Sequence, residues 1–259
     1  MPRKRAGRSG FHDINQGDWR GILKEILQGL VEVIRLIAGG DPALRTIAQL
    51  SLSVSGTALL ISTAIGIPLG TIVGLSRFTG RRLVVALLYT GMGFPPVVVG
   101  LFVYLMLSHS GPLGRLAWSF IPALFTPAAM VVAQTIISFP LVAGFTMAAV
   151  MGVSPHLRQQ VQSLGATPLQ SKLAVLAEAR VGVIVSIVAG FGSIISEVGA
   201  VMMVGGNIEQ RTRVLTTAII LETRKGNFDL ALALGVVLLA FAFITNIAVL
   251  WLQGGAFRE

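Results

Sequence analysis

Four side chains that can donate hydrogen bonds to an anion lie between positions 207 and 213, directly after a long apolar stretch. An amide, a hydroxyl and two guanidinium groups suit the oxygen atoms of a tetrahedral oxyanion. Basic groups at a pore mouth also favour anions. The alternatives are that these residues bind lipid headgroups or the acidic surface of another protein. The four residues are Asn207, Arg211, Thr212 and Arg213.

Glu197 places a carboxylate inside an apolar stretch. Ionisable groups within membrane segments usually face a bundle interior or a wet cavity, so a gate or a proton relay is one interpretation. A bare carboxylate would repel an oxyanion, which argues against direct substrate binding there. We therefore predict a structural role, in which Glu197 makes hydrogen bonds that fix a bend near Gly199 or an axis between two copies.

The sequence contains no recognisable constellation for catalysis, metal binding or nucleotide binding. Cysteine is absent, which excludes disulfides, thiolate metal sites and cysteine nucleophiles. The phosphate-binding pattern G-x-x-x-x-G-K-[ST] does not occur, so any ATP-driven step would need a partner. We therefore expect no catalytic residue, metal site or cofactor. The histidines show no metal-ligand spacing and are His12, His109 and His156.

Composition places these residues in a membrane protein. The chain is 54% hydrophobic and only 12% charged, whereas soluble domains are about 25% charged. Several charge-free runs exceed the roughly 20 residues that cross a hydrocarbon core. The net charge of +9 comes without a basic stripe interleaved with aromatic residues, so we expect no nucleic-acid partner. Basic residues that flank membrane spans explain the charge.

We predict an all-α, multi-pass protein with five spans, because only helices satisfy the backbone of such runs in lipid. Glycine and proline recur within the spans and permit kinks or close helix approach. Pro95, Pro96 and Gly100 form one such packing motif. The predicted spans are residues 48–75, 83–107, 127–151, 181–204 and 229–252.

The remaining segments complete the predicted domain organisation. Residues 1–20 form a basic arm, 21–47 an amphipathic helix in the membrane interface with a linker, 48–252 the transmembrane domain and 253–259 a tail. Short positive loops face the cytoplasm, which places the turn after position 75, the loop at 154–180 and the C-terminus inside. The N-terminal arm then lies outside, unless its helix crosses as a sixth span.

Residues 154–180 are a polar stretch between two apolar spans, and they predict two short helices with a break at 164–168. Gly165 can adopt a positive φ at the break, and Pro168 suits the first turn of the second helix. A helix–turn–helix without any partner is the alternative.

The loop resembles the cytoplasmic coupling loop of importer-type ABC permeases, whose pattern is Glu-Ala-Ala, three variable positions and Gly. This chain has Gln159, Gln160 and Val161 at the first three positions and Gly165 at the last. The resemblance implies that the loop contacts an ATPase through Gln159, Leu164, Gly165, Ala166, Thr167 and Pro168.

Further motifs between about 40 and 252 are similar to oxyanion permeases for molybdate and tungstate, and closest to the tungstate branch. The family that the chain resembles is the tungstate ABC transporter permeases, with a MetI-like transmembrane fold. The motifs are Phe94–Leu101, Ser110–Gly114, Ser196–Ala200, Gly205–Ile208, Thr216–Ile219, Leu221–Thr223 and Gly226–Phe228.

This resemblance implies a homodimer in a bacterial or archaeal cytoplasmic membrane, in contact with membrane lipid. Two cytoplasmic ABC ATPase subunits would drive it, and an extracytoplasmic oxyanion-binding protein would deliver the anion. Other interpretations are a permease for sulfate, phosphate or an amino acid, a secondary anion carrier without an ATPase, and a membrane scaffold. Secondary carriers usually show inverted repeats, and none is evident here.

Overall fold

The structure is a computed structural model that describes residues 42–116, 118 and 120–252. Every regular element in these residues is helical, which confirms the predicted all-α fold. The helices are α2 (Pro42–Leu75), α3 (Arg81–Met92), α4 (Pro96–Leu107), α5 (Pro127–Met151), α6 (Pro155–Ser163), α7 (Pro168–Glu178), α8 (Arg180–Ile195), α9 (Gly199–Gly205), α10 (Leu215–Arg224) and α11 (Phe228–Leu252), with a short 3-10 turn, η1, at Gly114–Leu116.

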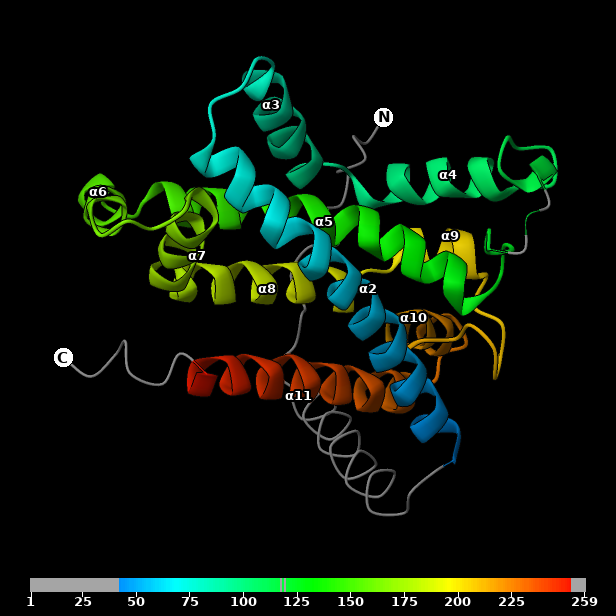
Figure 1. Ribbon diagram of the computed structural model, residues 1–259. Coiled ribbons are helices and arrows are strands. Elements are labelled where there is room, and N and C mark those ends of the chain that lie inside the picture. The colour runs from blue at the N-terminus through cyan, green and yellow to red at the C-terminus, as the bar shows by residue number, and fades with distance from the viewer. Residues whose placement is uncertain (1–41, 117, 119, 253–259) are drawn as a thin grey trace, which may run out of the picture.

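Two long helices, α2 and α5, cross at the centre of the bundle (Figure 1). The 34 residues of α2 span about 51 Å at ~1.5 Å per residue, more than a hydrocarbon core of about 30 Å. The close crossing depends on glycine, since a Cβ added at Gly66 would lie 3.0 Å from Val142 Cγ1. A Cβ at Gly70 would fall on the carbonyl oxygen of Ala143. Small residues spaced four apart therefore let the two backbones touch.

Two of the predicted spans are not continuous helices. The predicted span at 83–107 consists of α3 and α4, which meet at an angle of 104°. Pro95 is extended, with φ −62° and ψ 121°, and Pro96 begins α4, because a residue that precedes proline avoids the helical region. The predicted span at 181–204 is likewise divided, since α8 ends at Ile195 and α9 begins at Gly199.

Length and composition permit three to five membrane spans in the described residues. The helices α2 and α5 and residues Phe228–Ile247 of α11 are long and apolar enough to cross a membrane. The number reaches five if α3 with α4, and α7 with α8, each form one bent span. The second of these pairs includes α7, which lies in the predicted cytoplasmic loop. The five predicted spans thus match the upper number but not every boundary.

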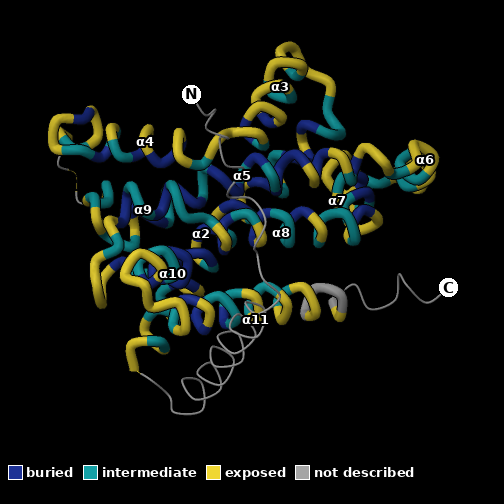
Figure 2. The backbone as a smooth tube through the Cα atoms, turned by 180° about the vertical axis from the view of Figure 1, so that it is seen from behind, coloured by how far each residue is buried: buried dark blue, intermediate teal, exposed yellow. Residues whose placement is uncertain are grey.

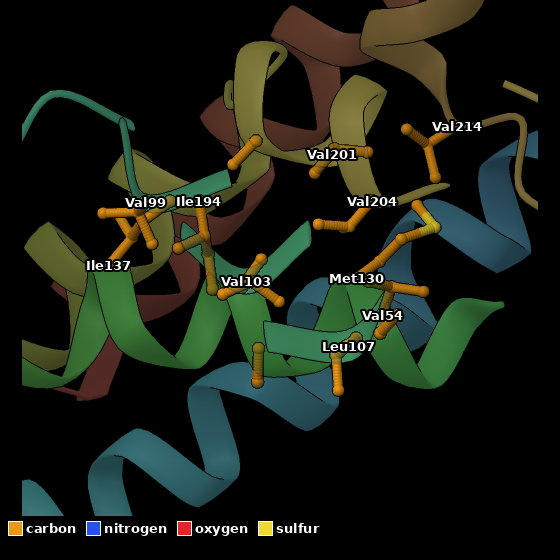
Figure 3. Close-up of a cluster of buried hydrophobic side chains, with 14 residues drawn as sticks. Val54, Val99, Val103, Leu107, Met130, Ile137, Ile194, Val201, Val204 and Val214 are labelled. Atoms are coloured by element: carbon orange, nitrogen blue, oxygen red, sulfur yellow. The ribbon is translucent and has the colours of Figure 1, made fainter. Parts of the chain in front are cut away.

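The principal core lies where the broken segments meet α5. Figure 3 shows side chains of α4, α5, α8 and α9 directed toward one another in this core. Met130 of α5 is fully buried there. By contrast, Leu60 (72%) and Leu239 (69%) are large apolar residues that are exposed, which suits contact with lipid. Figure 2 shows exposed residues along the outer helices and buried ones in the centre of the bundle. The buried core residues are Val54, Ala58, Val99, Val103, Leu107, Ala129, Met130, Ala133, Ile137, Ile194, Ala200, Val201, Val204 and Val214.

The predicted N-terminal arm, most of the interfacial helix with its linker, and the C-terminal tail lie outside the described residues. Of the segment 21–47, only residues 42–47 are described. These residues form the first turns of α2 and not a linker, so the first long helix begins six residues before the predicted position 48.

Candidate functional site

The polar loop at 154–180 folds as predicted into two helices, α6 and α7, with a break between them. Gly165 at the break has φ +85°. Thr167 caps α7, because its Oγ1 accepts a hydrogen bond from the Gln170 N–H at 3.3 Å and its own N–H donates to Gln170 Oε1 at 2.8 Å. Pro168 occupies the first position of α7. The turn is therefore determined by interactions between residues that are close in the sequence.

The need for glycine at position 165 is conformational and not spatial. A Cβ added to Gly165 would meet no other atom within 4 Å. A side chain at position 165 would therefore have room within the turn. The cost of a substitution lies in the left-handed backbone, which L-residues other than Asn and Asp rarely adopt.

One face of the loop is presented to the surroundings. Leu164 is 87% exposed, and Leu169 is 67% exposed. Gln159, Gly165, Thr167 and Pro168 are also exposed, whereas Ala166 is half-buried. The residues that resemble a coupling motif thus form an open surface with two unpartnered leucine side chains.

The opposite face of the loop rests on the ends of α2 and α5. Val175 of α7 and Ala179, which directly follows α7, are buried against Val150, near the end of α5. Arg158 of α6 donates a hydrogen bond from Nη1 to the carbonyl oxygen of Leu75, at 3.2 Å. In Figure 1, α6 and α7 accordingly lie at one end of the bundle, beside the ends of these long helices. The loop is therefore firmly seated.

A second cluster joins two motifs that are about 100 positions apart in the sequence. Glu197, in the gap between α8 and α9, accepts a hydrogen bond at Oε1 from the N–H of Ala200 at 3.0 Å. A Cβ added at Gly100 would lie 2.5 Å from Ala200 Cα, and one at Gly199 would lie 2.6 Å from Val97 Cγ2. The Pro95–Pro96 break and the Glu197–Gly199 break are thus brought together through contacts of α4 with α9.

The cluster extends to α10, because Thr216 Oγ1 donates to the carbonyl oxygen of Glu197 at 3.0 Å. The carboxylate of Glu197 therefore accepts a hydrogen bond from α9, and its carbonyl oxygen accepts one from α10. Both bonds connect the segment between α8 and α9 to neighbouring helices, and the bend-fixing role of Glu197 stays a prediction.

The four predicted anion-binding residues do not converge on one point. Thr212 is fully buried, donates to the carbonyl oxygen of Gly205 at 2.6 Å and accepts from the Ile208 N–H at 2.9 Å. Its hydroxyl therefore braces the turn, and the expectation that it faces a ligand does not fit this arrangement. Arg213 pairs with Glu209 at 3.6 Å, whereas Arg211 is exposed. Asn207 has φ +52°, and its Oδ1 is buried without a hydrogen bond.

Sequence reasoning did not find the residues that connect the loop to the helices. Arg158 bonds to a carbonyl 83 residues earlier, and no pattern in the sequence encodes that distance. The available signal was that Arg158 is a basic residue near the start of a helix, where the macrodipole does not favour a positive charge.

Comparisons with known proteins agree with this architecture. The family "Binding-protein-dependent transport system inner membrane component" matches residues 66–257. A probable anion ABC transporter permease protein from Haloferax volcanii is 44% identical over 206 residues, which cover 78% of this chain and 87% of the relative. A tungstate uptake system permease protein from Peptoclostridium acidaminophilum is 39% identical over 231 residues, which cover 89% of this chain and 99% of the relative.

Among solved structures, an inward-facing methionine ABC transporter, MetNI, is similar with a TM-score of 0.65 and 17% identity, over 80% of this chain and 93% of that one. At this identity the likeness concerns the fold alone. The all-helical bundle thus has a MetI-like fold. Together with the family match over residues 66–257, this fold shows that the chain belongs to the binding-protein-dependent transport system inner membrane components, the permease subunits of ABC transporters.

Proposed function

We propose that this chain is the permease subunit of an ABC importer for tungstate, with molybdate as the chemically nearest competitor. The similarity to a tungstate uptake permease supports this substrate, because it extends over 89% of the chain and 99% of the relative. The similarity to an anion permease supports the same charge class. The substrate is an oxyanion that the permease passes on and does not transform.

The observation that carries the coupling role is the seated loop at 154–180. Leu164 and Leu169 offer an exposed apolar surface for a cytoplasmic ATPase, while Arg158 ties the same loop to the end of α2. A movement of the ATPase would therefore reach α2 through a direct contact. Because the sequence has no phosphate-binding loop, ATP hydrolysis belongs to that partner.

The complete transporter would contain two copies of this chain in the cytoplasmic membrane of a bacterium or archaeon. The pathway would run between the copies, with two ATPase subunits at the loops and an extracytoplasmic binding protein at the opposite face. Asn207, Arg211 and Arg213 would meet that protein or the arriving anion. Glu197 would maintain the bend that shapes the pathway.

The first experiment is a mild-detergent pull-down of the tagged chain from native membranes. We expect the ATPase to be recovered with wild-type protein and to be lost with Gly165→Asp, because a charge then enters the docking surface. The matched control is Gly226→Asp. Gly226 has φ +80° and, like Gly165, no atom within 4 Å of an added Cβ, but it lies in the turn between α10 and α11. The two variants therefore carry similar backbone strain at different places.

Equal recovery of the ATPase with all three proteins would refute the coupling role of the loop. The substrate is tested separately, in proteoliposomes that contain the assembled complex and the purified binding protein. We expect ATP-dependent uptake of tungstate, competed by molybdate more strongly than by sulfate. Uptake of sulfate in preference to tungstate would reassign the substrate and leave the coupling role intact.

A further inference from the structure

A cavity of about 390 Å³ lies at the end of α2, between the turn that leads to α3 and the start of α6. Three arginines line it, namely Arg77 from the turn, Arg81 from the start of α3 and Arg158 from α6. Its wall comes from the end of α2, the turn that follows, the start of α3, the end of α5, the start of α6 and one residue of α7. The remaining lining residues are Gly74, Leu75, Ser76, Val150, Met151, Val153, Ser154, Pro155 and Val175.

Within the described residues, no carboxylate neutralises the three positive charges of this arginine cavity. No carboxylate lines the cavity, and none of the three arginines forms an ion pair within the described residues. The carboxylate of Glu178 lines a neighbouring pocket that shares Val153 and Ser154 with this one. Three cations that surround one space without a counter-ion repel each other, and a bound anion would relieve that repulsion.

Most guanidinium donors in the cavity are free. Each guanidinium carries five N–H donors. Arg81 uses Nε for the carbonyl oxygen of Val73 at 2.7 Å and Nη2 for the sulfur of Met151 at 3.4 Å. Arg158 uses Nη1 for the carbonyl oxygen of Leu75, and Arg77 makes no hydrogen bond in the described part of the chain. Two guanidinium groups are thus fixed in place by helix carbonyls and still present unused N–H groups.

The helix ends around the cavity do not cancel the positive charge of the three arginines. The helices α3 and α6 both begin there, and neither has an acidic residue in its first turn. The end of α2 contributes opposing carbonyl groups, but the carbonyl oxygens of Val73 and Leu75 already accept hydrogen bonds from two of the arginines. The cavity is therefore electropositive and rich in donors.

We propose that the arginine cavity binds a phosphate group, and that its physiological source is the headgroup of an anionic phospholipid. Guanidinium groups match phosphate oxygens in geometry, and basic pockets at the ends of membrane helices bind anionic headgroups. The apolar side chains of Val150, Met151 and Val175 lie in the same wall. An amphipathic ligand uses both kinds of surface, whereas free phosphate uses only the arginines. The site does not depend on which anion the chain transports.

The test measures lipid binding to the delipidated full-length chain by native mass spectrometry, with phosphatidylglycerol and phosphatidylcholine offered separately. We expect wild type to retain phosphatidylglycerol at least about tenfold more strongly. Arg77→Gln should weaken this binding about tenfold, since a hydrogen bond to a charged group is worth that factor. Arg77 makes no side-chain hydrogen bond or ion pair with the residues that the structure describes, so the variant should keep its unfolding temperature.

Arg82→Gln is the matched control, because Arg82 adjoins Arg81 in sequence and is exposed but does not line the cavity. An equal loss of phosphatidylglycerol in both variants would show diffuse charge attraction and overturn the site. A parallel titration with inorganic phosphate distinguishes the sources. Retention of phosphate with the same dependence on Arg77, but without a preference for the lipid, would assign the cavity to the free ion. Retention of neither ligand would overturn the proposal.

Discussion

The guanidinium of Arg158 and the carbonyl oxygen of Leu75 are joined by a 3.2 Å hydrogen bond that connects α6 with the last residue of α2. The bond closes a segment of 83 residues and attaches a surface loop to the longest described helix. A bond between a charged donor and a carbonyl contributes more than a neutral one, about 1.5–3 kcal/mol. The loop is therefore held by a specific contact in addition to the apolar packing of Val175 and Ala179.

Replacing Arg158 by Gln should loosen α6 without unfolding the bundle. We expect backbone amide hydrogen exchange at 155–163 to accelerate about tenfold, and transport per ATP hydrolysed to fall. Gln162→Ala is the control, because Gln162 is exposed on the same helix and its side chain makes no hydrogen bond with any described residue. If exchange in α6 is the same in both variants, the Arg158 bond does not hold the loop.

Substitution of Glu197 separates a bend-fixing role from a proton relay. Gln keeps an oxygen that can accept from the Ala200 N–H, whereas Ala removes it. We expect Glu197→Gln to retain transport. Glu197→Ala should lose about 1 kcal/mol of stability, which corresponds to roughly 2–4 °C in unfolding temperature. Loss of transport in Glu197→Gln at wild-type stability would instead show that the ionisable carboxyl itself is needed.

A methyl group added at Gly70 should separate the two central helices. The added Cβ falls on the Ala143 carbonyl oxygen and lies 3.0 Å from Thr146 Cβ, so α2 must move away from α5. Overpacking of this kind costs about 1–3 kcal/mol. Gly56→Ala is the control in the same helix, because no atom lies within 4 Å of its added Cβ.

Thermal unfolding followed by tryptophan fluorescence compares the two alanine variants. Gly56→Ala should unfold at or above the wild-type temperature, since alanine favours a helix by up to about 1 kcal/mol. A Gly70→Ala variant that is as stable as Gly56→Ala would show that the helices are not in such close contact.

Glu222 should make the start of α11 sensitive to acid. Hydrogen bonds from Lys225 and Asn227, both at 2.8 Å, lower the pKa of the Glu222 carboxyl below its ordinary value near 4.5. A lowered folded-state pKa adds stability above the unfolded-state pKa, and this stability is lost as the pH falls through the folded-state pKa. The turn from α10 to α11 is thus strongest at neutral pH.

The measurement is the unfolding temperature of wild type and Glu222→Gln as a function of pH. We expect the wild type to be more stable at pH 7 and the difference to shrink below about pH 4.5. Glu209→Gln provides the comparison, because Glu209 is 72% exposed in its pair with Arg213, and such pairs contribute little. A difference that grows on acidification would contradict the assigned sign.

The sequence predicted correctly those helix ends and turns that are determined by neighbouring capping, proline and glycine residues. The helix α5 has the predicted bounds 127–151, because Thr126 and Pro127 start it and Gly152 follows its end. The turn at Gly165 and Pro168 was predictable for the same reason. Continuous hydropathy concealed the breaks near positions 94 and 197, since apolar residues on both sides give the same composition whether the helix is straight or bent.

Contacts between distant segments were beyond such reasoning. Nothing in the sequence places Gly100 on Ala200 or Arg158 on Leu75, because each contact depends on how the helices cross. The hydrogen bonds of Thr212 also depend on the fold of its turn, so a hydroxyl that looks available in the sequence is enclosed in the structure.

The helix α2 is long enough to connect two distant parts of the bundle. Near one end, Ser51 Oγ accepts a hydrogen bond from the N–H of Leu215, the first residue of α10, at 2.8 Å. At the other end, Leu75 is attached to Arg158. These two attachment points are about 36 Å apart along the helix, so a tilt of about 5° at one displaces the other by about 3 Å. We therefore expect a displacement at α6 to be transmitted along α2 to α10, beside Thr216 and its bond to Glu197.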